Sequence, residues 1–469
     1  MNHHQAPILE AIAQYLELDH APFYMPGHKR GVGIDPEFMA LLGENLFRLD
    51  LPELPNLDES ITKAEELAAD AYGSDCTWFL VNGSTSGIAA MMLAVVGIGD
   101  KILMGRNCHK AAIAGLVLCG ATPIYLETDY NSEFDLDCGV SPSTLQAALE
   151  ANPDVKAVML VSPNYFGVCG ELEELVAIAH SFNIPILIDA AHGGHLRFHP
   201  DLPIDALTAG ADVVVHSIHK MGSSLTQTAM LHIQGTRVSS DRLDQAVQML
   251  QSTSPNILLL ASLDVARRQM VLHGQELLQK TIALSNYGRS QINQISNLHC
   301  LDHIPNLDPT RLTVMVNQLG KTGFDVDEIF YQDLGVMAEL PTLSQLVFVV
   351  SIGNTAADVD RLILAFQNLA NQKRKKTLPI PPIPKMPKAN LKLTPREAFF
   401  SPNCAMSLES ASGRICTELI SPYPPGIPII CPGEEISLEV IDFLKLIKDA
   451  GGVINGCSDR TMATIKVVI

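Results

Sequence analysis

A chain of 469 residues has room for roughly two or three domains. Apolar residues make up 47% and charged residues 18%, which is the composition of a folded globular protein and excludes a disordered one. The net charge of −19 argues against a nucleic-acid partner, because phosphate contacts need clustered lysine and arginine side chains.

The ten cysteines include no CxxC pair. We therefore expect no metal site, and we interpret them as reduced thiols of a cytoplasmic protein. The first residues lack the basic and apolar regions of a signal peptide, and no apolar stretch reaches the ~18–20 residues that span a membrane. No membrane partner is expected.

The N-terminal part is predicted to be an arm over residues 1–57. Residues 7–18 have the apolar spacing of a short amphipathic helix, and irregular chain rich in glycine and proline follows. Residues 61–72 predict the next helix.

Short apolar runs then alternate with helical segments as far as residue 220. Strands that are apolar throughout, with helices between them, predict an α/β fold with a mainly parallel sheet covered on both faces. Ligands of such sheets bind beyond the carboxyl ends of the strands. We assign residues 58–275 to this large domain, with strands at 77–81, 100–104, 122–127, 155–163, 184–192 and 211–220.

The rest of the chain predicts two further units. A smaller α+β domain is expected over residues 276–375, with three strands and a closing helix at 311–319, 336–340, 345–353 and 358–371. Five prolines then fall between Pro379 and Pro387, which indicates extended chain. We assign residues 376–469 to this linker and a C-terminal domain.

Two polar features follow predicted strands in the large domain. The turn at 83–86 opens a helix, so Ser84, Thr85 and Ser86 either cap that helix or help its N–H groups bind an anion. Asp189 ends an apolar strand. It either caps the next turn or accepts a hydrogen bond from a protonated ring nitrogen, and Ala191 is small enough to lie against a flat ring.

Two more features carry reactive nitrogens. His109 opens a helix and is either a capping residue or a ring that stacks on a cofactor. Lys220 follows a valine run, and is either solvated at a strand end or desolvated and able to form a Schiff base. Ser217 and His219 can donate to a phosphate. Phosphate donors, an anion and an amine, in this order along the chain, are what pyridoxal 5′-phosphate (PLP) needs.

Several longer motifs occur in the order found in one family. The chain resembles the ornithine/lysine/arginine decarboxylases, which have the aspartate-aminotransferase-like fold of PLP enzymes (fold type I). The length suits the shorter members, which lack a receiver-like domain. The motifs are APFYMPGHKRG (21–31), FLVNGSTSG (79–87), RNCHKA (106–111), SPNYFGVCGEL (162–172), DAAHGGH (189–195), SIHK (217–220) and SPYPPGIPIICPGE (421–434).

The resemblance implies a role for each matching residue. Lys220 would hold the cofactor as a Schiff base, Asp189 would pair with its ring nitrogen, and His109 would stack on the ring. A proton would return to the substrate from Lys220 or His219. The phosphate would be surrounded by Ser84, Thr85, Ser86, Ser217 and His219, with Ala191, His192 and Asn164 beside the ring.

The resemblance also implies the activity, which is PLP-dependent decarboxylation of a basic L-amino acid in polyamine biosynthesis. We place arginine (to agmatine) first, ahead of lysine (to cadaverine) and ornithine (to putrescine). Glu418 matches an acidic position that would bind the cationic substrate, or it is a surface helix glutamate. In a homodimer, His28 would reach the neighbouring active site, or it belongs to a structural arm.

Other functions stay open on the sequence. An aminotransferase or lyase of the same fold is one, and Arg311 and Arg361 are then the candidates for binding a substrate carboxylate. A non-catalytic PLP-binding protein is another. Three residues depart from the family pattern beside the expected cofactor, at positions Met221, Ala190 and Arg197, where the family usually has threonine, often glutamate, and a smaller or aromatic residue.

Overall fold

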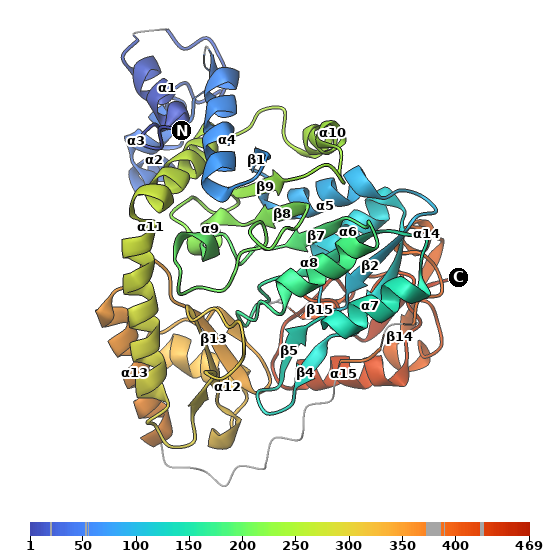
Figure 1. The fold of residues 1–469 in the computed structure, drawn as a ribbon. Helices are drawn as coiled ribbons and strands as arrows, with labels where there is room; N and C mark the ends of the chain where they lie inside the picture. The colour runs from blue at the N-terminus through green and yellow to red at the C-terminus, as the bar shows by residue number, and fades with distance from the viewer. Residues whose placement is uncertain (19–20, 52–53, 55, 372–385, 389, 423–425) are drawn as a thin grey trace.

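The computed structural model describes residues 1–469 apart from 19–20, 52–53, 55, 372–385, 389 and 423–425 (Figure 1). Its largest element is a seven-stranded sheet. The strands are parallel except at one side, where β9 runs antiparallel to both of its neighbours. In spatial order they are β1 (Cys76–Leu80), β9 (Ala229–Ile233), β8 (Val213–His216), β7 (Ile186–Asp189), β6 (Val155–Val161), β2 (Lys101–Gly105) and β3 (Thr122–Leu126).

Helices cover both faces of this sheet, as the apolar strands predicted (Figure 1). In β8, Val214 packs into one hydrophobic cluster, while Val213 and Val215 pack into the cluster on the opposite face. One face is covered by α5 (Gly83–Val95), α6 (Lys110–Cys119) and α10 (Ser240–Leu250), and the other by α1 (Pro7–Leu16), α4 (Leu57–Tyr72), α7 (Pro142–Ala151), α8 (Leu172–Ser181) and the start of α11 (Ile257–Ile292).

A second sheet forms the core of residues 299–371. It has four antiparallel strands, where we expected three. The strand expected at 336–340 is paired in the sheet only at its end, because a π-helical turn and Gly335, with φ +62°, delay its entry. The elements are β10 (His299–Cys300), β11 (Arg311–Met315), β13 (Gln345–Val349), β12 (Leu340–Pro341), η2 (Asn317–Leu319), α12 (Gly323–Ile329), η3 (Phe330–Leu334) and α13 (Ala356–Asn371).

The C-terminal part has a hydrophobic cluster of its own. The proline-rich segment expected before it lies mostly outside the described residues. Its elements are α14 (Pro395–Phe400), β14 (Asn403–Ser407), η4 (Leu408–Ser410), β15 (Ser421–Pro422), α15 (Leu438–Asp449), β16 (Ile454–Asn455) and β17 (Thr464–Val468). The remaining elements of the chain are α2 (Pro36–Leu42), α3 (Glu44–Leu49), β4 (Asp129–Asn131), β5 (Leu136–Gly139), η1 (Leu196–Phe198) and α9 (Ile218–Met221).

Among the described residues, no helix has the length and apolar character to cross a membrane. Within the same ranges, no group of three or more His, Cys, Asp or Glu side chains is placed to hold a metal ion. The domain boundaries proposed from the sequence stay predictions.

Arg106 ties the C-terminal part to the main sheet. Its guanidinium follows β2 and donates to the carbonyl oxygens of Pro428 and Ile429, at 2.9 and 3.0 Å. It also forms a buried ion pair with Glu434 at 3.4 Å. These bonds fix the chain next to Ile427, which lines the pocket described below.

We expect Arg106→Met to lower the free energy of unfolding by about 3–5 kcal/mol, because it leaves the Glu434 carboxyl buried without its cation. Urea denaturation of both proteins measures this difference. Lys101→Met is the control, because Lys101 pairs with Asp154 at the surface, and its urea midpoint should stay close to that of the wild type. Equal midpoints for the wild type and Arg106→Met would contradict the expectation.

Candidate active site

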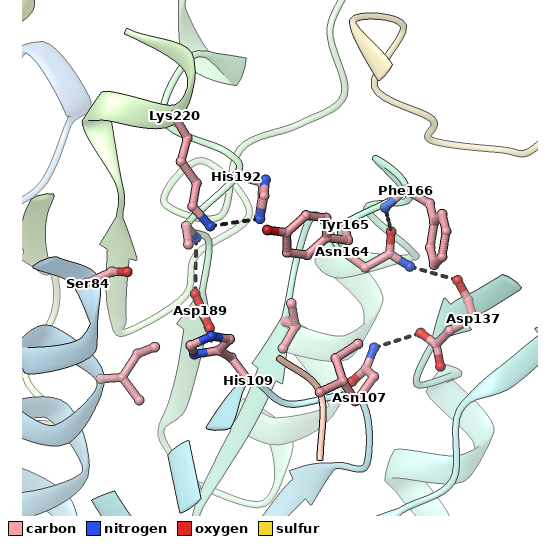
Figure 2. A pocket seen from close by; sticks show the side chains of 14 residues that line it. Ser84, Asn107, His109, Asp137, Asn164, Tyr165, Phe166, Asp189, His192 and Lys220 are labelled. Carbon is pink, nitrogen blue, oxygen red and sulfur yellow. Dashed lines mark hydrogen bonds between the residues drawn. The ribbon is translucent and has the colours of Figure 1, made fainter. Parts of the chain in front are cut away.

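A pocket opens beyond the carboxyl ends of β2, β6 and β7, where ligands of such sheets bind (Figure 2). The residues that line this pocket include seven that the sequence predicted as site residues, namely Ser84, His109, Asn164, Asp189, Ala191, His192 and Lys220.

Lys220 reaches the pocket from α9, the single helical turn that follows β8. Its Nζ lies 2.9 Å from Nε2 of His192 and 5.5 Å from the ring centroid of Tyr165. Burial lowers the pKa of Lys220, while the carboxylates of Asp189 and Glu339 act in the opposite direction. The lysine is therefore a desolvated amine and not a solvated strand end.

Asp189 is the last residue of β7 and is 4% exposed. Its Oδ1 accepts a hydrogen bond from the Ala191 N–H at 3.1 Å, so the capping role expected as one alternative is present. It also lines the pocket. Burial raises the pKa of its carboxyl, against the effects of Lys220 and the Ala191 N–H. A cationic group in the pocket would stabilise the carboxylate form.

His109 has the capping role that the sequence left open as one alternative, and it also lines the pocket. It is the N-cap of α6, and its Nδ1 accepts from the Ala111 N–H at 3.2 Å. This bond assigns the proton of the neutral ring to Nε2. Burial lowers the pKa of His109 to about 4, with smaller effects from Lys220 and Lys110. The pocket is therefore lined by a neutral imidazole.

The N-terminus of α5 faces the same pocket. Ser84 lines it, and the Ser217 hydroxyl donates to the Ser84 hydroxyl at 2.7 Å. Ser86 donates to the Gly83 carbonyl, and Thr85 is exposed. The side chain of Asn82, the N-cap residue, makes no capping hydrogen bond to α5. This arrangement suits an anion such as a phosphate.

Asn164 is held rigidly after β6. Its Oδ1 accepts from the N–H groups of Phe166 and Val168, each at 3.0 Å, and its Nδ2 donates to the Asp137 carbonyl at 2.7 Å (Figure 2). Asn107 donates to the Asp137 carboxylate at 2.7 Å. Asn107, Asp137 and Tyr165 also line the pocket and were not predicted as site residues, although Asn107 and Tyr165 follow strand ends.

Six predicted site residues are not among the described residues that line this pocket, namely Thr85, Ser86, Ser217, His219, His28 and Glu418. His219 lies with Nδ1 2.9 Å from the Thr228 carbonyl, and His28 lies with Nε2 3.1 Å from Asp50. Glu418 accepts from the N–H groups of Ser458 and Lys466, at 2.7 and 2.9 Å. It is buried and outside any helix, so its interpretation as a surface helix glutamate was wrong. The substrate and cofactor contacts assigned to these residues stay predictions.

The three departures from the family pattern are not among the described residues that line the pocket. Met221 is buried, with its Sδ 2.9 Å from Nη1 of Arg311. Ala190 is buried in the core of the main sheet. Arg197 bonds to the Ala71 carbonyl and the Thr208 hydroxyl, and does not line the pocket. The expectation that Arg197 lies beside the cofactor was wrong, because its guanidinium turns toward the end of α4.

Comparison with known proteins gives one family. Residues 6–306 match the Orn/Lys/Arg decarboxylase major domain, and residues 388–460 match the Orn/Lys/Arg decarboxylase C-terminal domain. An arginine decarboxylase of Bacillus subtilis is 37% identical over 100% of this chain and 99% of its own length. A lysine decarboxylase of Pseudomonas aeruginosa is 25% identical over 94% of this chain and 76% of its own.

Solved structures agree on the fold. The constitutive lysine decarboxylase of E. coli superposes with a TM-score of 0.83 at 20% identity, covering 99% of this chain and 82% of that one. A pyridoxamine-pyruvate aminotransferase of Mesorhizobium loti superposes with a TM-score of 0.57 at 15% identity, over 72% and 90% of the two chains. The fold-type I architecture predicted from the sequence is confirmed, and the chain belongs to the ornithine/lysine/arginine decarboxylase family of amino acid decarboxylases.

Proposed function

We propose that this protein decarboxylates a basic L-amino acid with PLP as cofactor, and that arginine is the substrate. The observation that carries the proposal is one pocket in which the Lys220 amine, the Asp189 carboxyl and the His109 ring meet beside the N-terminus of α5. The full-length relatives named arginine decarboxylases favour arginine over lysine and ornithine. The product, agmatine, is consistent with polyamine biosynthesis.

The side chains present fit PLP. The Lys220 amine suits the aldehyde, and the buried Asp189 carboxyl, with its raised pKa, gains a partner in a protonated ring nitrogen. His109 and Ala191 offer flat and small surfaces to the ring. Ser84, Ser217 and the N–H groups of α5 suit the phosphate.

The cofactor, when bound, supplies a sink for the electron pair left by the departing carboxylate. The side chains of this protein bind and orient the cofactor and carry the proton. The buried Asp189 carboxyl would pair with the protonated ring nitrogen, and His109, held by its cap, packs as a neutral ring. Lys220 is the amine that binds the cofactor and can carry a proton at Nζ. His219 is the second candidate for that proton.

The alternative of an aminotransferase gains no support from the pocket. No arginine is among the described residues that line it. Arg311 bonds to His192 and Met221, and Arg361 lies against Gly335. Decarboxylation is therefore the function that we propose.

The assembly that we propose is a homodimer. The arm exposes apolar side chains that a partner copy would cover, among them Phe23 at 95% and Leu41 at 78%. His28 in this arm and Glu418 in the C-terminal part are proposed to complete a site at that interface. The ten cysteines are all free, which favours a reducing compartment, and we propose the cytoplasm.

The substrate assay is direct. Supplied with PLP, the protein should release CO₂ and the matching amine fastest from arginine, with lower kcat/KM for lysine and ornithine. Lys220→Ala should lose activity by roughly 10³-fold or more, as expected when a covalent catalytic amine is removed, and should lose the visible absorption band. A keto acid product without CO₂ would contradict decarboxylation, and a colourless wild type would contradict PLP binding.

The neutral state of His109 has a pH signature in the apoprotein. Its folded pKa of about 4 lies below the unfolded value, so protons bind the unfolded chain first as pH falls below ~6.5, and stability is lost. His109→Asn keeps a helix cap but does not titrate. From pH 7 to 5, the wild type should lose on the order of 2 kcal/mol more unfolding free energy than His109→Asn.

Urea denaturation at both pH values measures this difference. All other histidines are present in both proteins and cancel. An equal loss in wild type and His109→Asn would contradict a neutral His109.

The dimer is tested by sedimentation equilibrium at micromolar concentration. The wild type should have the mass of two chains, and Leu41→Glu, which puts a charge on the apolar arm, should shift the mass toward one chain. Leu364→Glu is the control, because Leu364 is 54% exposed on α13, and its mass should match the wild type. A monomeric wild type would overturn the proposal.

A further inference from the structure

Behind Lys220 lies a line of buried polar groups that joins the two sheets. Nε2 of His192 is 2.9 Å from the Lys220 amine, and Nδ1 of the same ring is 3.2 Å from Nη2 of Arg311. His192 is 6% exposed and Arg311 is 1% exposed. Figure 2 shows His192 pointing its ring edge at the end of the Lys220 side chain.

The direction of these two bonds follows from the donors available. A guanidinium has N–H donors and no acceptor, so Nδ1 of His192 must accept from Arg311. A neutral imidazole that accepts at Nδ1 carries its proton at Nε2. That proton points at Lys220, so Nζ must accept it with a lone pair. An ammonium group has no lone pair to offer.

Arg311 is itself held in place. It begins β11, and its Nη1 lies 2.9 Å from Met221 Sδ and 3.3 Å from Thr310 Oγ1. Its charge is balanced by Asp308, 3.9 Å away. Burial would raise the pKa of Asp308, but His195, at 3.1 Å, and Arg311 together hold it well below its usual range. Met221, the departure from the family pattern, therefore contacts Arg311.

The groups that face Lys220 pull in opposite directions. Asp189 from β7 and Glu339, just before β12, favour the ammonium form. Burial, Arg311 from β11 and the Nε2–H of His192 favour the free amine. His109 is neutral, and the ring of Tyr165 lies 5.5 Å away and favours a cation. Among these influences, the hydrogen bond from His192 depends on the tautomer of its ring. A single substitution at Arg311 can therefore reverse its direction.

We propose that Arg311 is a positioning residue that fixes the tautomer of His192 and, through it, holds Lys220 as the unprotonated amine. This form has the lone pair that a nucleophilic amine needs. This inference rests on the proposed function in one respect, because PLP would supply the aldehyde that the amine binds. The amine state itself is a property of the apoprotein.

The test measures Lys220 in the apoprotein by competitive acetylation with acetic anhydride between pH 6 and 10, with a free amine as internal standard and peptide mass spectrometry as the readout. In Arg311→Met, His192 can turn its proton to Nδ1 and accept from an ammonium group at Nε2. The reactivity of Lys220 at neutral pH should fall roughly tenfold, which corresponds to one unit of pKa.

Two comparisons separate this role from a structural one. Arg289→Met also removes a buried arginine beside β11, where Arg289 donates to the carbonyl oxygens of Arg311 and Leu301, at 2.8 and 2.9 Å. It should leave the reactivity of Lys220 unchanged. In a His192→Phe background, adding Arg311→Met should change that reactivity less than it does in the wild type.

If Arg311→Met does not fold, two substitutions of His192 test the proposal instead. Glutamine can accept from Arg311 and donate to Lys220, so His192→Gln should keep the reactivity that His192→Phe loses. The proposal is overturned if Arg311→Met leaves the reactivity unchanged, if Arg289→Met lowers it as much, or if His192→Gln and His192→Phe behave alike. Because the substrate is absent from every arm, failure of decarboxylation would leave this result unaffected.

Discussion

The desolvation of one amine is the constraint on which the rest of the site depends. Lys220 is held at the edge of an apolar sheet, where burial disfavours its charged form. His192 bonds to it from the turn that follows β7, and Arg311 reaches His192 from the second sheet. The two sheets therefore meet behind the pocket, and the Arg106 contacts bring the C-terminal part to the same pocket.

The parts of the fold that local pattern determines could be predicted from the sequence. Continuous apolar runs such as Val213, Val214 and Val215 predicted a parallel sheet buried on both faces, and alternate valines do pack into opposite clusters. The strand β9 was not predicted. It comes soon after Lys220 in the chain, with no long helix between them, and it pairs antiparallel with its neighbours. The small sheet was predicted with one strand too few, since β10 has only two residues.

The candidate site likewise contains residues that the sequence predicted and residues that it did not. Asp189 ends a strand of the main sheet, and His109 and Lys220 follow strands of it, so their positions in the chain bring them to one edge. Asp137 and Arg311 come from β5 and β11, and tertiary packing brings them close in ways that no sequence pattern indicates. For Asp189 and His109, a capping bond does not exclude a place at the pocket, because each side chain uses one atom for the helix or turn and lines the pocket as well.

The identity of the reactive lysine is the central claim, and one measurement tests it. The protein is loaded with PLP, reduced with borohydride to fix the cofactor on the amine that holds it, digested, and analysed by mass spectrometry. The account predicts a pyridoxyl group on Lys220. The same group on another lysine, such as Lys110 beside His109, or an unmodified Lys220 in loaded protein, would contradict it.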